Sequence, residues 1–137
     1  MTKTVLVVED DPSVREALQG MLSLSDLNVV AVSRPEIACE LAESIVPDLC
    51  IIDVMLPSAS GIELAAELRD CGFGHTPLIA MSASPLMVEY AGESGLFQRV
   101  MNKPLDLDEL VFTIDQLLDA AEDGDSDAPA GAPDTGR

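Results

Sequence analysis

Apolar residues follow two different patterns along this chain. Short, continuous runs of aliphatic residues are typical of strands that are covered on both faces of a parallel sheet. Such runs occur at Thr4–Val8, Val29–Val32, Leu49–Ile52 and Leu78–Met81, with a weaker run near Arg99–Met101. Each run is followed by a stretch whose apolar residues recur at helical spacing. Five strand and helix pairs in alternation predict an open parallel α/β sheet, because parallel strands need crossover connections.

Capping signals precede each of the five predicted helices. A serine or aspartate at the start of a helix accepts a hydrogen bond from one of its free N–H groups. The signals are Asp11-Pro12, Ser33–Glu36, Ser60 with Glu63, Ser84-Pro85, and Asp106 with Glu109. Glycine favours helix ends, so Gly72 is predicted to end the third helix, and Gly92 and Gly95 to break the fourth.

The apolar pattern stops near Ala121. Residues 122–137 are first acidic and then rich in alanine, proline and glycine, with no apolar face to bury. The sequence therefore predicts one folded domain over residues 1–121 and a disordered acidic tail over residues 122–137. We expect the folded part to act alone, without an output module.

Charge narrows the possible partners. The 137 residues include 25 Asp and Glu against 7 Lys and Arg, which gives a net charge of −18. This charge repels phosphate backbones and anionic lipids, so nucleic-acid and membrane binding are both disfavoured. No apolar run approaches the ~20 residues that a membrane span needs, and no secretion signal is present.

Cysteine and histidine are too sparse for several other chemistries. The three cysteines are spaced too widely for a CxxC metal site, which favours free thiols in a reducing cytoplasm. The single histidine, His75, leaves little material for a catalytic triad or a zinc site.

The residues that follow the predicted strands carry the candidate chemistry. Glu9 and Asp10 follow the first strand, Asp53 the third, Ser82 the fourth and Lys103 the fifth. The carboxyl ends of parallel strands share one edge, where open α/β sheets bind ligands. Clustered carboxylates select Mg²⁺ or a similar divalent ion, and a hydroxyl and an ammonium suit phosphoryl oxygens. We therefore expect Mg²⁺-assisted phosphoryl transfer, with a carboxylate as acceptor.

Four motifs in this order resemble the receiver domain of two-component response regulators. They are Val7-Val8-Glu9-Asp10-Asp11, the stretch Pro47–Pro57 with Gly61, Ser82-Ala83, and Lys103-Pro104. The resemblance covers about residues 3–119. It implies a flavodoxin-like, doubly wound sheet of five parallel strands in the order 2-1-3-4-5, with five helices.

The resemblance also implies a metal site. Asp10, Asp53 and the backbone carbonyl of Met55 would bind Mg²⁺, and Glu9 would act through a water molecule.

Other matched residues would handle the phosphoryl group. Asp53 would be the phospho-acceptor, Ser82 would hydrogen-bond a phosphoryl oxygen, and Lys103 would pair with that group. The Lys103-Pro104 bond would be cis. The donor in this family is a histidine kinase or a histidine phosphotransfer protein.

The resulting hypothesis is a single-domain response regulator in the cytoplasm that is not an enzyme and signals to a downstream protein. Two departures favour an alternative, an adaptor that binds partners independently of phosphorylation. Val100 stands where the family usually has Tyr or Phe, and the stretch from Gly95 to Lys103 is about one residue longer than the common pattern. A third reading, a phosphatase with an aspartyl nucleophile, needs a carboxylate where Met55 stands.

Overall fold

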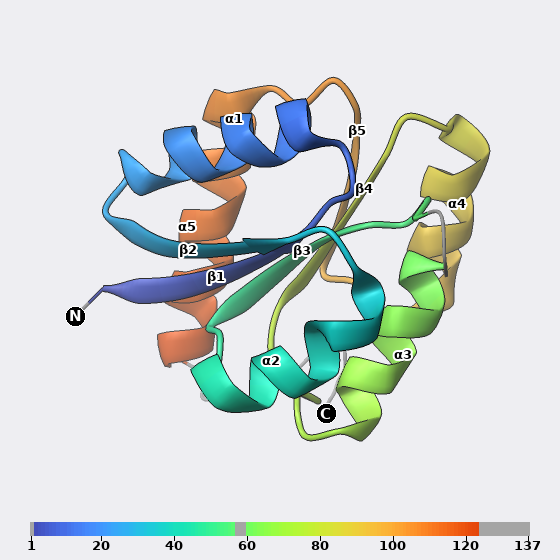
Figure 1. Ribbon diagram of the computed structural model, residues 1–137, viewed down its shortest axis with the longest axis horizontal. Helices are drawn as coiled ribbons and strands as arrows, with labels where there is room; N and C mark the ends of the chain where they lie inside the picture. The colour runs from blue at the N-terminus through green and yellow to red at the C-terminus, as the bar shows by residue number, and fades with distance from the viewer. Residues whose placement is uncertain (1, 57–59, 124–137) are drawn as a thin grey trace.

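Five parallel strands form one sheet in the computed structural model, which describes residues 2–56 and 60–123 (Figure 1). The strands are β1 (Lys3–Val8), β2 (Leu27–Val32), β3 (Leu49–Asp53), β4 (Leu78–Ser82) and β5 (Arg99–Asn102). Their order is β2-β1-β3-β4-β5, and every neighbouring pair is parallel. This is the predicted doubly wound, flavodoxin-like order. Pro57, from the motif after Asp53, lies outside the described residues.

Helices cover both faces of this sheet. In the described part of the chain they are α1 (Pro12–Ser23), α2 (Ala38–Ile45), α3 (Gly61–Asp70), α4 (Pro85–Ser94) and α5 (Leu107–Asp123). The helices α1 and α5 lie on one face, and α2, α3 and α4 lie on the other (Figure 1). Both faces of the central strands are therefore buried, which explains their unbroken apolar runs.

The strand β1 shows how the two cores divide. Val5 and Val7 pack with the leucines of α1 and α5, whereas Leu6 and Val8 pack with the residues of α2 and α3. All four side chains are fully buried. Successive strand residues point to opposite faces, so the run contributes to both cores at once. Each such side chain contributes about 1.5–3 kcal/mol of burial free energy.

Four of the five predicted helix caps are confirmed. The side chains of Asp11, Ser60, Ser84 and Asp106 each accept a hydrogen bond from a backbone N–H two or three residues later, at 2.8, 3.1, 3.3 and 3.1 Å. These bonds satisfy N–H groups that the first helical turn leaves free.

The prediction of a capping box over Ser33–Glu36 is wrong. The chain first forms a short 3₁₀ turn at Pro35–Ile37, and α2 begins only at Ala38. Neither the turn nor α2 has a side-chain cap. Pro35 occupies the first position of the turn, which its fixed φ angle suits. Ser33–Glu36 has the spacing of a capping box, but α2 begins after these residues, so they do not cap it.

The glycine predictions are partly confirmed. Gly72 follows the end of α3 with a φ of 113°, and Gly95 ends α4 with a φ of 75°. Gly92 does not break α4, because it lies inside that helix. A single glycine weakens a helix by about 1 kcal/mol, which the packing of its neighbours can offset.

The last helix extends past residue 121, after which the predicted tail begins. The helix α5 runs to Asp123 and includes two positions assigned to the tail, residues 122 and 123. The rest of the predicted tail, residues 124–137, lies outside the described residues. Within the described ranges, no helix is both long enough and apolar enough to cross a membrane.

Arg69 connects two segments at the amino-terminal ends of the strands β4 and β5. Its guanidinium donates hydrogen bonds to three backbone carbonyls between α3 and β4, those of Phe73, Gly74 and Thr76. It also donates to the carbonyl of Leu96 and the side-chain oxygen of Gln98, just before β5. One cation thus fixes two connections that lie far from the predicted site.

Val46 ends α2 in the left-handed region, with φ 48° and ψ 71°. A β-branched residue is strained there, by about 1–2 kcal/mol. The residue is 65% exposed, so little packing is lost on replacement. Val46→Asn is expected to raise the free energy of unfolding by about 1 kcal/mol, since asparagine tolerates this region. Urea unfolding followed by circular dichroism measures the change, with Val46→Ala as the variant that keeps the strain. Equal stability of the two variants would contradict this explanation.

Candidate functional site

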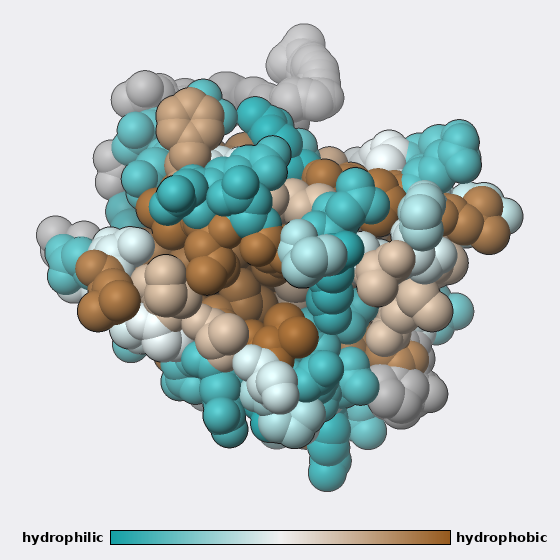
Figure 2. All heavy atoms as spheres, turned by 90° about the horizontal axis from the view of Figure 1, so that it is seen from above, coloured by the Kyte–Doolittle hydropathy of each residue, from teal (hydrophilic) through white to brown (hydrophobic). Residues whose placement is uncertain are grey.

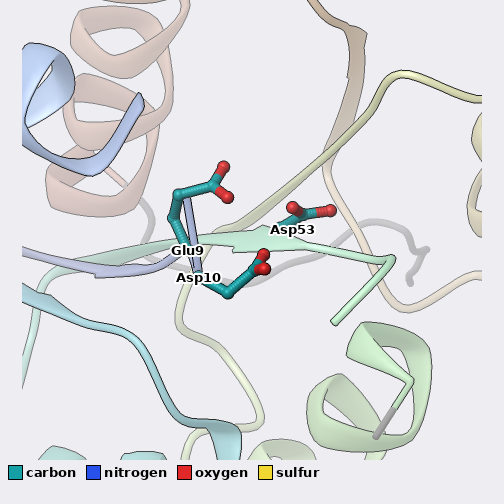
Figure 3. Close-up of side chains that lie close together, drawn as sticks. All are labelled: Glu9, Asp10 and Asp53. Carbon is teal, nitrogen blue, oxygen red and sulfur yellow. The ribbon is translucent and has the colours of Figure 1, made fainter. Parts of the chain in front are cut away.

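Three carboxylates meet where β1 and β3 end. The two strands are neighbours, with Val8 paired to Ile52, so the residues that follow them emerge side by side. Glu9, Asp10 and Asp53 each have a carboxylate oxygen within 4.8 Å of the other two (Figure 3). Among the described residues, no other group of three acidic, histidine or cysteine side chains is this close. The structure thus brings together the acids that the sequence placed on separate strand ends.

Lys103 reaches this cluster from the end of β5. Its Nζ lies 2.9 Å from Asp53 Oδ2 and 2.6 Å from Glu9 Oε1. Burial alone would lower the pKa of Lys103, but its ion pair with Glu9, its hydrogen bond to Asp53 and the charges of both carboxylates raise that pKa above its usual value. The lysine is therefore held as a cation between two carboxylates. The following Lys103-Pro104 bond is cis, as predicted.

Glu9 is fully buried and uses its two oxygens differently. Oε2 accepts a hydrogen bond from the backbone N–H of Asp11 at 3.0 Å. Oε1 has the close ion pair with Lys103 but no well-aligned hydrogen bond from the described residues. Burial raises the pKa of Glu9, as does the charge of Asp53, while Lys103 and the Asp11 N–H oppose the shift. Oε1 can therefore accept a further hydrogen bond.

The backbone around Asp53 holds its carboxylate in place. Oδ1 accepts a hydrogen bond from the Met55 N–H at 2.8 Å, and only 4% of the residue is exposed. Gly61 packs against the backbone of Asp53 and Val54 so closely that a Cβ atom would lie 2.4 Å from the Asp53 carbonyl oxygen. An isolated bridge between Met55 and Ser60 spans the connection to α3.

Ser82 stands at the end of β4, between the strands that carry Asp53 and Lys103. It is fully buried, and its Oγ accepts a hydrogen bond from the Ser84 N–H at 3.0 Å. Its carbonyl accepts a hydrogen bond from the Lys103 N–H at 2.8 Å. Ser82 therefore shares the edge with the acids and the lysine, and its hydroxyl proton is available for another acceptor.

Two features of the site were not predicted from the sequence. Arg15, in the first turn of α1, donates to the backbone carbonyls of Glu9 and Asp10 at 3.0 and 3.3 Å. It fixes the loop that carries the acids. The pairing of Lys103 with Glu9 was also missed, because only the pairing with a phosphoryl group was expected. The position of Arg15, one turn after the Asp11 cap, is the sequence signal from which its contact with this loop could have been predicted.

An apolar groove adjoins Lys103. It has a volume of about 430 Å³ and runs between α1 and the connection from β5 to α5. Its lining consists of Ser13, Val14, Ala17, Leu18, Ala83, Lys103, Pro104, Leu105 and Leu107. Figure 2 looks at the molecule from above and shows hydrophobic residues lining a hollow, bordered by hydrophilic ones. Apolar surface thus lies next to the polar cluster.

The donor set fits a hard divalent cation. Carboxylate oxygens are the ligands that Mg²⁺ prefers, and it usually takes only one or two of them from the protein. Three carboxylates within 4.8 Å of one another repel unless positive charge lies among them. Lys103 supplies one such charge, and a bound cation would supply more.

Known proteins are similar to this chain in sequence. The response regulator receiver domain profile matches residues 5–115, so the chain belongs to the response regulator receiver family. The response regulator MprA of Mycolicibacterium vanbaalenii is 33% identical over 119 residues, which cover 86% of this chain and 51% of MprA. A cyclic di-GMP phosphodiesterase of Thermotoga maritima is 46% identical over 66 residues, which cover 48% of this chain and 17% of that protein. The MprA relatives are thus about twice as long as the matched segment.

Solved structures agree with the fold. A putative response regulator from Chloroflexus aurantiacus superposes with a TM-score of 0.80 at 25% identity, over 87% of this chain and 99% of that one. The BeF3-activated receiver domain of RstA from Klebsiella pneumoniae gives a TM-score of 0.74 at 27% identity, over 84% of this chain and 97% of that one.

Proposed function

We propose that this domain accepts a phosphoryl group on Asp53 with the help of Mg²⁺. Asp10, Asp53 and the backbone carbonyl of Met55 would hold the ion, with Glu9 acting through a water molecule. When bound, Mg²⁺ would neutralise charge on the carboxylates and on the phosphoryl oxygens. The observation that carries the proposal is the meeting of Glu9, Asp10, Asp53 and Lys103 at one edge of the sheet.

The transfer itself needs one nucleophilic oxygen. Oδ1 of Asp53 is held by the Met55 N–H, and Oδ2 faces the Lys103 ammonium. As a carboxylate oxygen bonds to phosphorus, the P–N bond of a donor phosphohistidine breaks, and the freed imidazole keeps the electron pair and takes up a proton. Asp53 needs no general base, because it reacts as a carboxylate.

Lys103 and Ser82 would receive the new phosphoryl oxygens. The Lys103 ammonium lies 2.9 Å from Asp53 Oδ2, so a short movement brings it to an oxygen attached to the same side chain. Charge-assisted hydrogen bonds to phosphate are about twice as strong as neutral ones. The Ser82 hydroxyl would donate its proton to another oxygen. In the phosphorylated domain, Lys103 would therefore shift part of its pairing away from Glu9.

The family and the position of the site support a proposal for the donor and the output. The donor would be a histidine kinase or a histidine phosphotransfer protein, as response regulators imply, and the reaction would take place in the cytoplasm. The phosphohistidine of the donor must reach Asp53 across the edge of the sheet that the apolar groove borders. The groove would therefore give the donor a surface to bind. We propose a regulator that changes its contacts with a downstream protein, rather than an enzyme with turnover.

Incubation with acetyl phosphate tests this function. The wild-type chain with Mg²⁺ is expected to gain one phosphoryl group, measured by intact mass. Asp53→Asn keeps the size of the side chain but loses the nucleophile, so no adduct is expected. Chelation of Mg²⁺ should slow the wild-type reaction by at least about 100-fold, since the cation stabilises charge in the transition state. If neither acetyl phosphate nor a panel of kinases modifies the wild-type chain, the proposed function is wrong.

A second candidate function is an adaptor that binds its partner with or without phosphorylation. Val100 carries this alternative, because it packs among small apolar residues, Val54, Ala80 and Ala91, where the family usually has an aromatic ring. An aliphatic side chain there cannot act as a rotating aromatic switch. Partner affinity separates the two functions. Equal binding by the wild type, by Asp53→Ala and by beryllofluoride-treated protein would favour the adaptor.

A further inference from the structure

Two cysteines from different helices meet away from the acidic site. Cys39 lies in the first turn of α2, and Cys71 is the residue that ends α3. Their Sγ atoms are 2.9 Å apart, although the residues are 32 positions apart in the chain. Both side chains are half-buried at the margin of the apolar cluster between α2 and α3. The sequence alone predicts only free thiols at these positions.

The separation of the sulfur atoms discriminates between two uses of a dithiol. Two thiolates on one tetrahedral Zn²⁺, each at about 2.3 Å, would lie about 3.8 Å apart. A disulfide needs about 2.05 Å, so the observed atoms would have to approach by less than about 1 Å. In the described part of the chain, no acidic, histidine or third cysteine side chain has a ligand atom within 4.8 Å of both sulfur atoms, since only the acidic cluster forms such a group of three. The geometry therefore favours a disulfide over a metal site.

The surroundings of Cys39 disfavour the ionised form of its thiol. Burial raises the pKa of Cys39 to about 12, together with the hydrogen bond to Cys71, the charge of Cys71 and the nearby carboxylates of Glu67 and Glu43. Cys39 is therefore a poor first nucleophile, because the thiolate is the reactive form. Two of the causes named depend on the Cys71 thiol and vanish once that sulfur is bonded elsewhere.

We propose that Cys39 and Cys71 are a site of reversible oxidation, at which a small disulfide compound converts the two thiols into an intramolecular disulfide between α2 and α3. The Cys71 thiolate attacks one sulfur of the reagent, forms a mixed disulfide and releases the first reagent thiolate. Cys39 then loses its proton and attacks the Cys71 sulfur, which releases the second. Two protein thiols are oxidised and one reagent disulfide is reduced to two thiols.

The disulfide would close a loop that contains β3. The phospho-acceptor candidate, Asp53, lies within this segment, and so does Gly61. Cross-linking two distant positions removes conformational freedom from the unfolded chain, more so for longer loops. Oxidation would therefore stabilise the fold around the segment that carries Asp53. This inference does not depend on the proposed phosphoryl chemistry.

Thiol counting tests the proposal. The full-length chain is treated with 2-hydroxyethyl disulfide, a neutral reagent that the flanking carboxylates do not repel. Free thiols are then titrated in denaturant. We expect three before treatment, one afterwards and three again after reduction with dithiothreitol, because the chain has three cysteines. Peptide mapping should identify the Cys39–Cys71 link and leave Cys50 as the free thiol. The melting temperature should rise by about 5 °C or more on oxidation.

The matched control is Cys71→Ser, which replaces one sulfur at a half-buried position. Its melting temperature should not rise on treatment, and no internal link should form. Cys50 serves as the internal reference, since it is fully buried in β3. Three free thiols in the treated wild type, or a link that includes Cys50, would overturn the proposal.

Discussion

Replacing Lys103 with methionine is expected to lower the free energy of unfolding by about 3 kcal/mol near neutral pH. Methionine keeps an unbranched side chain of similar length but has no charge. Glu9 is fully buried, and Lys103 is the cation beside its Oε1. Without Lys103, folding would bury an uncompensated carboxylate next to Asp53. Breaking a buried ion pair by removing one partner is costly for that reason.

The loss should depend on pH in a defined direction. Burial already raises the pKa of Glu9, and losing Lys103 removes one of the two influences that lower it. The folded variant would then hold a proton that the unfolded chain releases above the ordinary value of 4.5. Its stability should fall as the pH rises from that value and level off above the folded-state pKa. The deficit relative to the wild type is therefore smallest in acid and full near neutral pH.

Urea unfolding at several pH values measures this effect. The double variant Lys103→Met, Glu9→Gln is the matched control, because glutamine removes the unpaired charge while keeping the shape. It should recover most of the lost stability, and its remaining deficit should not depend on pH. Mg²⁺ should stabilise the single variant more than the wild type, since no ammonium competes for the carboxylates. Identical stability of the single variant and wild type at all pH values would contradict this account of the site.

Replacing Gly61 with alanine should have the second large effect, a loss of about 3 kcal/mol. Gly61 is the first residue of α3, where alanine would normally be favourable. Here the added Cβ would lie 2.4 Å from the Asp53 carbonyl oxygen and 2.6 Å from the Val54 Cα. Both atoms belong to the backbone and cannot rotate away. The clash must be relieved by moving the chain that carries Asp53, so phosphoryl acceptance should slow as well.

Gly20→Ala is the matched control for this substitution. Gly20 lies inside α1, and a Cβ there would meet no atom within 4 Å. It is expected to stabilise the protein by about 0.5–1 kcal/mol, as helical alanine does elsewhere. Unfolding measurements and acetyl phosphate kinetics on both variants give the comparison. If Gly61→Ala is as stable and reactive as the wild type, the close approach has no role in the site.

The parallel sheet could be predicted because its three central strands, β1, β3 and β4, carry runs of residues that are buried on both faces. The run Val5–Val8 is one such strand, and Asp53 ends another. In a parallel sheet the carboxyl ends of the strands share an edge, so the strand pattern places Asp53 on the same edge as Glu9 and Asp10. The strand order was predicted from the family resemblance, because the pattern of apolar residues does not indicate which strands are neighbours.

What could not be predicted depends on contacts between distant side chains or on where the backbone turns. The start of α2 was misplaced because a 3₁₀ turn at Pro35 intervenes, and spacing alone does not distinguish the two kinds of turn. The approach of Cys39 to Cys71 depends on how α2 packs on α3. Likewise, the ion pair between Lys103 and Glu9 joins the ends of β5 and β1, which are separated by two strands, and no local pattern encodes that contact.

The acidic site is assembled from the two ends of the folded chain and its middle. Asp53 is 50 positions from Lys103, and β1 and β5 are separated in the sheet by β3 and β4. A partly folded chain that lacks any one of these strands cannot complete the constellation. Chemical competence is thus a property of the whole cooperative unit, so loss of reactivity in denaturant should coincide with global unfolding rather than precede it.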